Sequence, residues 1–272
     1  MSQPTPLTDP TALARNRARA DADALFLQEL ACDEVQDRLD MVNKTFQSPA
    51  VVTAFPHLWP ARLPHAVIVP EGETLNLQPQ AHDVVVHSLG LHWANDPVGQ
   101  LIQCRRALRP DGMLLALALG GQSLHELRSC LAEAEIAVRG GLSPRVAPMA
   151  ELRDLGALLQ RAGLALPVAD SVPVHVQYTS MWHLMRDLRA MGEGNALTAR
   201  HRGFSARAVF SKAADIYART FPGDAGRIRA TFELIVLTGW APDDSQLKPL
   251  RPGSAQARLA DALQTDETPL SD

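Results

Sequence analysis

The amino-acid sequence predicts an α/β fold in which a doubly wound sheet carries helices on both faces. Between residues 49 and 240, short apolar runs typical of buried strands alternate with amphipathic segments typical of helices, and this alternation favours a parallel sheet covered on both sides. A strand, a helix and another strand follow one another from His82 to Leu119, which makes one complete βαβ unit. The 272 residues suffice for one such domain with an arm and a tail.

Residues 1–46 are predicted to form a helical arm, because apolar residues recur at helical spacing from residue 9 onward. The arm carries a basic cluster of Arg15, Arg17 and Arg19, which two aspartates follow. Because opposite charges lie so close together there, we expect a solvated helix face rather than a phosphate-binding site.

The main domain is predicted to span residues 47–240, and the prolines beyond it predict an irregular tail at 241–272. Strands are expected at 50–55, 66–69, 82–89, 113–119 and 228–237, and helices at 97–108, 123–138, 149–161, 181–191 and 205–219. Ser123 and Glu126 form a capping-box pattern at the start of one helix. Pro167 and Pro173 are expected to break a further stretch of strand character.

The composition argues against several classes of protein. A formal net charge of -4 and a pI near 6.1 offer no basic face for nucleic acid. The longest apolar run, Met113–Leu119, is too short for a membrane span, and the nine histidines show no spacing typical of a metal site. The cysteines Cys32, Cys104 and Cys130 form no C-x-x-C pair, and the polar N-terminus lacks the apolar core of a secretory signal. We therefore expect reduced thiols and a cytoplasmic protein.

Longer strings in the second half resemble a known family. They read SLGLHWANDP from Ser88, QCRRALRPDG, LGGQSLHELR, YTSMWHLMRDLRAMGEGNAL and LTGWAPDDSQLKPL. The chain is similar to class I S-adenosylmethionine (SAM)-dependent methyltransferases, and within them to the family of the mitochondrial complex I assembly factor reported as an arginine hydroxylase. It resembles malonyl-acyl-carrier-protein methyltransferases more distantly. The likeness covers roughly residues 15–255 and is specific from Asp83 onward, and it implies a Rossmann-like methyltransferase fold.

The half of the domain that would hold the cofactor departs from this family. The resemblance implies SAM at the carboxyl ends of the first strands, held by a glycine-rich loop after strand one and by acidic residues after strands two and three. The matching region, residues 50–59, has no glycine and no acid. Only 36 residues separate Phe46 from Asp83, whereas two overlapping βαβ units need about 50 to 60. We therefore predict a shortened cofactor-binding half.

Five residues are candidates for the cofactor side of the site. The resemblance puts Glu71 where the family has an acid after strand three, and Glu73 follows it; the alternative is a pair of solvated loop carboxylates. Leu91, His92 and Trp93 lie just past the third predicted strand, at the rim where open parallel sheets bind ligands. The alternative for Trp93 is simple packing.

Five further residues are candidates for substrate or partner binding. Gly120 and Gly121 close the next strand at the same rim, where they leave room either for a ligand or for a tight turn. Glu193 and Asn195 match a family segment in the loop 192–202, which we expect to be exposed. Trp59 lies in the abnormal region, and it either fills the vacated pocket or forms an exposed docking patch.

These observations leave two hypotheses for function. The preferred one is a methyltransferase-fold protein with a degenerate SAM site and no cofactor, which binds or assembles a protein partner; the resemblance implies a respiratory-complex subunit. The alternative is a working enzyme with a rebuilt pocket, either a SAM-dependent methyltransferase or a protein-arginine hydroxylase. SAM is implied by the resemblance alone.

Overall fold

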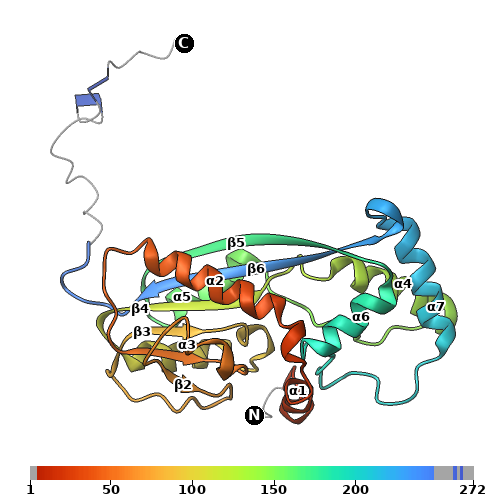
Figure 1. Cartoon of the computed structure of the whole chain (residues 1–272), viewed down its shortest axis with the longest axis horizontal. Coiled ribbons are helices and arrows are strands. Elements are labelled where there is room, and N and C mark those ends of the chain that lie inside the picture. The colour runs from red at the N-terminus through yellow and green to blue at the C-terminus, as the bar shows by residue number, and fades with distance from the viewer. Residues whose placement is uncertain (1–4, 248–259, 262–263, 266–272) are drawn as a thin grey trace. The chain divides into compact units, whose positions relative to one another are not determined.

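The computed structural model describes residues 5–247, 260–261 and 264–265 (Figure 1). Its elements are α1 Pro10–Arg17, α2 Phe26–Asp40, β1 Pro49–Val52, β2 Val67–Val69, β3 His82–His87, α3 Pro97–Ala107, β4 Leu108–Leu119, α4 His125–Arg139, α5 Leu152–Arg161, β5 Ala165–Tyr178, α6 Met181–Ala190, α7 Arg207–Thr220 and β6 Ile228–Trp240. The chain divides into two compact units, residues 1–242 and 243–272. The first contains α1, α2 and the sheet, and much of the expected tail at 241–272 lies outside the described residues.

The strands form one sheet in the order β2-β1-β3-β4-β6-β5. The first four strands of the chain pair in parallel, so the predicted α/β fold is confirmed. The parallel arrangement does not extend further, because β6 lies antiparallel between β4 and β5. Strand direction depends on how the connecting segments cross the sheet, which the apolar pattern does not encode.

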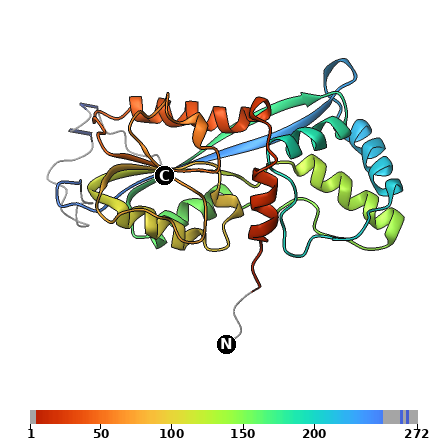
Figure 2. The ribbon, with the colours of Figure 1, turned by 60° about the horizontal axis from the view of Figure 1, so that its bottom comes forward.

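Helices cover both faces of the sheet (Figure 2). Val51 and Val84 point into one core together with residues of α2. The neighbouring Ala50 and Val85 point into the other core together with residues of α3 and α5. Successive strand residues alternate between faces, so a sheet buried on both sides needs continuous apolar strands. The continuous apolar runs in the sequence therefore predicted correctly that both faces of the sheet are covered.

The predicted shortening of the cofactor-binding half is confirmed. Between β1 and β2 the chain forms only a one-turn 3-10 helix, Pro56–Leu58, and between β2 and β3 it has no helix or strand. β1 pairs directly with both β2 and β3. The two crossover helices that would cover this part of the sheet are thus replaced by loops.

The predicted capping box of α4 is wrong. The helix begins at His125 without a side-chain cap, and both predicted capping residues bond to β6 instead. The Ser123 hydroxyl accepts the N–H of Glu233 at 2.9 Å, while the Glu126 carboxylate accepts the Thr231 hydroxyl at 2.6 Å. Contacts across more than 100 residues of sequence therefore override the local pattern.

The prolines expected to break the stretch after α5 do not break it. β5 runs continuously through Pro167 and Pro173, with an irregular register only between Ala165 and Val168. β5 is an edge strand that pairs with β6 alone, and an edge strand tolerates proline because its outer N–H groups have no partner strand.

Within the described residues, no helix combines the length and apolar composition that a membrane crossing requires.

Candidate functional site

A cavity of about 590 Å³ opens at the carboxyl ends of β1, β2 and β3. The arm contributes Thr8, Pro10, Leu13, Ala14 and Arg17 to its lining, and the strand ends contribute Thr53, Ala54, Ile68, Pro70, Glu71, Gly72, Glu73 and Gly90. Its volume lies in the range of small-molecule sites. The position agrees with the rule that open α/β sheets bind ligands beyond the carboxyl ends of their strands.

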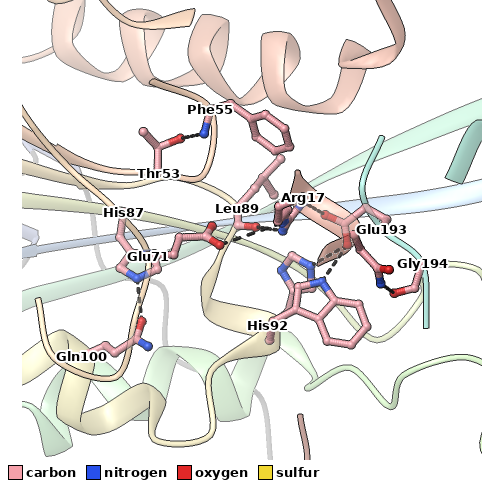
Figure 3. A network of polar contacts seen from close by, with 12 residues as sticks. Arg17, Thr53, Phe55, Glu71, His87, Leu89, His92, Gln100, Glu193 and Gly194 are labelled. Carbon is pink, nitrogen blue, oxygen red and sulfur yellow. Dashed lines mark hydrogen bonds and ion pairs between the residues drawn. The ribbon is translucent and has the colours of Figure 1, made fainter. Parts of the chain in front are cut away.

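The side chain of Arg17 reaches from the end of α1 into the wall of this cavity (Figure 3). Its Nη1 lies 2.6 Å from Oε1 of Glu193, and its Nη2 donates to the carbonyl oxygen of Leu89 at 3.3 Å. The guanidinium also lies over the Phe55 ring, 5.3 Å from the ring centroid. Both partners of the ion pair have side chains only 7% exposed, so water screens their attraction little.

Two further contacts hold Glu193 in place. The indole N–H of Trp93 donates to Oε2 at 2.7 Å, and Nε2 of His92 lies 3.3 Å from the same oxygen. The backbone N–H of Leu119 donates to Nδ1 of His92 at 3.4 Å, which leaves Nε2 as the nitrogen that donates to Glu193. Burial alone raises the pKa of Glu193, but the charge of Arg17 and these donors hold the pKa at about 2. The carboxylate is therefore ionised at neutral pH.

Glu71 lies on the other side of Arg17, with its Oε2 3.9 Å from Nε of the guanidinium. Its Oε1 is buried and has no hydrogen-bond partner among the residues that the structure describes. Burial raises the pKa of Glu71, and the nearby charge of Glu193 adds to this effect, while Arg17 opposes it. The Glu71 carboxyl packs where a methyl group on Gly90 would stand, so a side chain at that position would have to displace the carboxyl.

His87 supports the loop that carries Glu71. It is buried inside β3, and its Nε2 lies 2.7 Å from Oε1 of Gln100. The amide of Gln100 in turn donates to the carbonyl of Gly72 at 3.0 Å. Burial lowers the pKa of His87 to about 4. Neutral His87 thus contacts Gln100 of α3, and Gln100 bonds the loop that follows β2.

A second, smaller cavity of about 210 Å³ lies beside the first. Trp93 lines both cavities, while Glu193 and Asn195 line the second one. Asn195 donates to the carbonyl of Pro144 at 2.9 Å and accepts the N–H of Leu197 at 3.0 Å, so its amide joins its own loop to the segment after α4. The partition between the cavities therefore includes Trp93 and the Arg17–Glu193 ion pair.

The residues of the larger cavity offer a carboxylate that suits the ribose of SAM, but they do not offer the glycine loop that the family has after its first strand. The unpartnered Oε1 of Glu71 lies after a strand adjacent to β1, where a carboxylate bonds ribose hydroxyls in dinucleotide folds. In the loop after β1, two of the N–H groups at the end of the strand bond within the protein. The N–H of Thr53 donates to the Val69 carbonyl and that of Phe55 to the Thr53 hydroxyl, each at 3.0 Å. The site does not fit SAM in the way that the glycine loop of the family holds it.

The structure brings several predicted site residues together and leaves others apart. Glu71, Glu73 and Trp93 line the larger cavity, although Glu71 follows the second strand of this chain rather than a third. His92, Trp93 and Glu193 form one cluster. Leu91 does not join them, because it packs into the core beside α3.

Three other predicted residues lie away from both cavities. Trp59 is fully buried in the core that contains α2, so it neither fills the cavity nor forms an exposed patch. A side chain on Gly120 would meet Ile235 and Glu233, and one on Gly121 would collide with Glu151. Close packing of a chain reversal thus accounts for both glycines.

Sequence reasoning missed Arg17, the residue around which the site is organised. The solvated face expected for the basic cluster is correct for Arg15 and Arg19 and wrong for Arg17. Residues two apart on an α-helix point in nearly opposite directions, so the spacing of the three arginines already indicated that Arg17 faces the other way. The loop 192–202 is likewise less exposed than expected, because Ala196 and Leu197 are buried against the arm.

Comparisons with known proteins agree with the resemblance in the sequence. A model described as a methyltransferase domain matches residues 16–116. A putative methyltransferase from Rickettsia prowazekii is 30% identical over 167 residues, which cover 61% of this chain and 71% of that protein. This chain belongs to the methyltransferase family. A solved structure of a putative methyltransferase from Bacillus halodurans matches with a TM-score of 0.49 at 13% identity, covering 77% of this chain and 98% of that one.

Two groups of curated relatives extend the likeness. The mitochondrial arginine-hydroxylase NDUFAF5 of Danio rerio is 37% identical over 210 residues, covering 75% of this chain and 65% of that protein. A malonyl-[acyl-carrier protein] O-methyltransferase from Laribacter hongkongensis is 35% identical over 182 residues, covering 67% of this chain and 58% of that protein. The predicted kinship with both groups is confirmed. The chain spans 65% and 58% of the length of these two relatives, respectively.

Proposed function

We propose that this chain is a methyltransferase-family protein with a degenerate SAM site, which acts as a binding or assembly factor for a protein partner. The observation that carries the proposal is the loop after β1, which lacks glycine and in which the N–H groups of Thr53 and Phe55 bond within the protein. A SAM molecule would lose the backbone contacts that the family supplies there.

The partner in this proposal is a protein with an accessible basic segment. Glu71 and Glu73 line the larger cavity, and Glu193 lies behind Arg17, so the rim is suited to positive charge. The relatives named as arginine hydroxylases act, by that name, on arginine. The sequence resemblance extends the proposal to a subunit of a respiratory complex.

A second candidate is a working enzyme, either a SAM-dependent methyltransferase or a protein-arginine hydroxylase with a rebuilt pocket. One observation favours it: the larger cavity is open, because Trp59 packs elsewhere, and Oε1 of Glu71 is free to accept a hydroxyl. A ligand held through this oxygen would have to do without the glycine loop.

Calorimetric titration with SAM and S-adenosylhomocysteine, checked by thermal shift, tests the proposal. The degenerate site predicts no heat and no shift at millimolar ligand, with an active family methyltransferase as the positive control. Saturable binding that raises Tm with ligand concentration would overturn the degenerate site and establish a usable pocket. If binding occurs, the variant Glu71→Gln tells whether the Glu71 carboxylate holds the ligand, since its loss should then weaken binding.

A further inference from the structure

We propose that the outer side of α6 and the loop before α7 form a docking surface for an acidic segment of a partner protein. The surface, which we call the basic aromatic face, consists of six exposed residues: Trp182, Arg186, Arg189, Arg202, Phe204 and Arg207. Helices α6 and α7 pack side by side at one end of the first unit (Figures 1 and 2). The inference rests on the proposed binding function, to which it adds a second contact with the partner.

Two aromatic side chains of this face reach into solvent. Phe204 is fully exposed and Trp182 is 43% exposed. Trp182 contacts Phe210 of α7, with the ring centroids 6.0 Å apart, so the neighbouring helix supports it. An aromatic ring buries a large apolar area when a partner covers it, and tryptophan is enriched among the residues that dominate binding energy at protein interfaces. The two rings are therefore suited to anchor a partner.

The loop that carries Phe204 is fixed to the same part of the fold. The hydroxyl of Ser205 accepts Nη1 of Arg145 at 3.1 Å. The guanidinium of Arg145 also lies over the Phe210 ring, 5.3 Å from its centroid, so one arginine joins the loop to the ring that supports Trp182. Because these contacts already position the loop, less conformational freedom is lost when a partner binds.

The cations of this face are available to an external partner. Arg186 and Arg189 follow Trp182 by about one and two turns of α6, which puts the three side chains on one side of the helix. Among the described residues, Arg186, Arg189 and Arg207 form no ion pair. Arg202 contacts an aspartate at 3.4 Å and keeps a side chain that is 67% exposed. The face therefore carries positive charge that the protein itself neutralises little.

Two nearby acidic side chains are already bonded within the protein. Asp187 of α6 accepts the Tyr178 hydroxyl at 2.7 Å, and Glu135 accepts Nη2 of Arg145 at 2.7 Å. Asp215 is exposed, but it lies two turns from the start of α7. The whole chain has a formal net charge of -4, so the local excess of positive charge belongs to this face in particular. Charge complementarity favours a partner segment rich in carboxylates.

An acidic protein segment fits this face better than an anionic bilayer does. A guanidinium pairs with a carboxylate through two parallel hydrogen bonds, which gives the contact a defined geometry. The exposed side of α6 presents Trp182 among charged residues, whereas a helix that lies in a lipid surface needs a broad apolar side. The occupant that we infer therefore combines carboxylates with a few apolar side chains.

The test uses the fluorescein-labelled peptide EEFEELEEFEE as the probe and the same peptide with glutamine in place of every glutamate as its neutral control. Fluorescence anisotropy with the full-length chain should show binding of the acidic peptide at low salt, and the affinity should fall as the salt concentration rises, because salt screens exposed charges. The neutral peptide should bind at least about 10-fold more weakly.

Variants locate the binding surface. The double variant Arg186→Gln with Arg189→Gln should weaken binding of the acidic peptide by at least about 10-fold, and Phe204→Ser should weaken it by about 5-fold or more. The matched controls are Arg153→Gln with Arg161→Gln, which removes two exposed arginines of α5, and Met41→Ser, which removes an apolar side chain that is 75% exposed. Both controls should bind as the wild type does.

Several outcomes would overturn the inference. They are an absence of binding at low salt, equal binding of the two peptides, and unchanged affinity in the folded variants of the face. Cosedimentation with phosphatidylserine vesicles without binding of the acidic peptide would indicate a lipid surface instead. The variants lie on a helix and in a loop, so if circular dichroism shows that one of them unfolds, the other still tests the face.

The peptide titration and the SAM titration fail separately. SAM binding would remove the degenerate site and leave the peptide result unchanged, because the basic aromatic face shares no residue with the lining of the larger cavity. Failure of the peptide to bind would remove the docking surface and leave the degenerate site intact.

Discussion

Arg17 and Glu193, which are 176 positions apart in the sequence, form a buried ion pair 2.6 Å long that fastens the N-terminal arm to the loop after α6. The pair joins the end of α1 to the loop after α6 at the rim where β1, β2 and β3 end (Figure 3). The ion pair therefore holds α1 against the loop after α6 and also lies at the centre of the candidate site.

Replacing Glu193 with alanine should strongly destabilise the protein. The variant leaves Arg17 buried without its main partner, and removal of one member of a buried ion pair costs about 3 to 5 kcal/mol. Urea unfolding measures the change in the free energy of unfolding. The double variant Arg17→Met with Glu193→Leu should lose much less, because neither charge remains. Equal losses in the single and double variants would show that the ion pair contributes no coupling.

Stability should fall as the pH drops below neutrality because of His87. The unfolded chain takes up a proton near pH 6.5, whereas burial lowers the pKa of His87 to about 4 in the folded protein. Between pH 6.5 and pH 4, His87 is protonated in the unfolded state but not in the folded state. The free energy of unfolding therefore decreases by roughly 3 kcal/mol over this range and levels off below pH 4. The variant His87→Gln, measured by urea unfolding across this range, should lack this part of the slope. The exposed His201→Gln should retain it.

The substitution Gly90→Ala should disturb the larger cavity by displacing Glu71. The new methyl group would collide with the Glu71 carboxyl, and overpacking of this kind costs about 1 to 3 kcal/mol. Gly141→Ala is the matched control, since nothing lies within 4 Å of its added methyl group. Thermal unfolding should separate the two variants. Adding Glu71→Ala to Gly90→Ala should recover stability, and no recovery would mean that the strain lies in the backbone.

Trp59 should matter to the fold rather than to binding. It is 0% exposed and belongs to the core that contains α2, and truncation of a buried tryptophan to alanine costs about 3 to 5 kcal/mol. Trp182→Ala is the control, because that side chain is 43% exposed. Near-equal losses of unfolding free energy in the two variants would contradict the buried position of Trp59.

The sequence predicted those features that depend on local composition or on length. The apolar run around Val84 predicted a buried strand, and the 36 residues between Phe46 and Asp83 predicted a shortened cofactor-binding half, because two overlapping βαβ units need a longer segment. Glu71 lines the larger cavity and His92 lies beside Glu193, and the resemblance rather than their spacing indicated Glu71 and Glu193. Their roles in binding stay predictions.

Features that depend on distant contacts could not be predicted. Ser123 and Glu126 have the right spacing for a capping box, but Glu233 and Thr231 of β6 compete successfully for their side chains. The partner of Arg17 lies in a loop whose polar residues look solvated in the sequence. In each case a long-range hydrogen bond, which no local pattern records, decides the outcome.

The two outer strands have a consequence for association with other molecules. β2 has only three residues and lies between Pro64 and Pro70, while β5 carries Pro173 within its paired length. Short strands and prolines at sheet edges hinder the addition of a strand from another chain, which is how many natural proteins avoid fibrillar aggregation. The sheet is poorly suited to growth at either margin, so edge-to-edge recruitment of a partner strand is disfavoured.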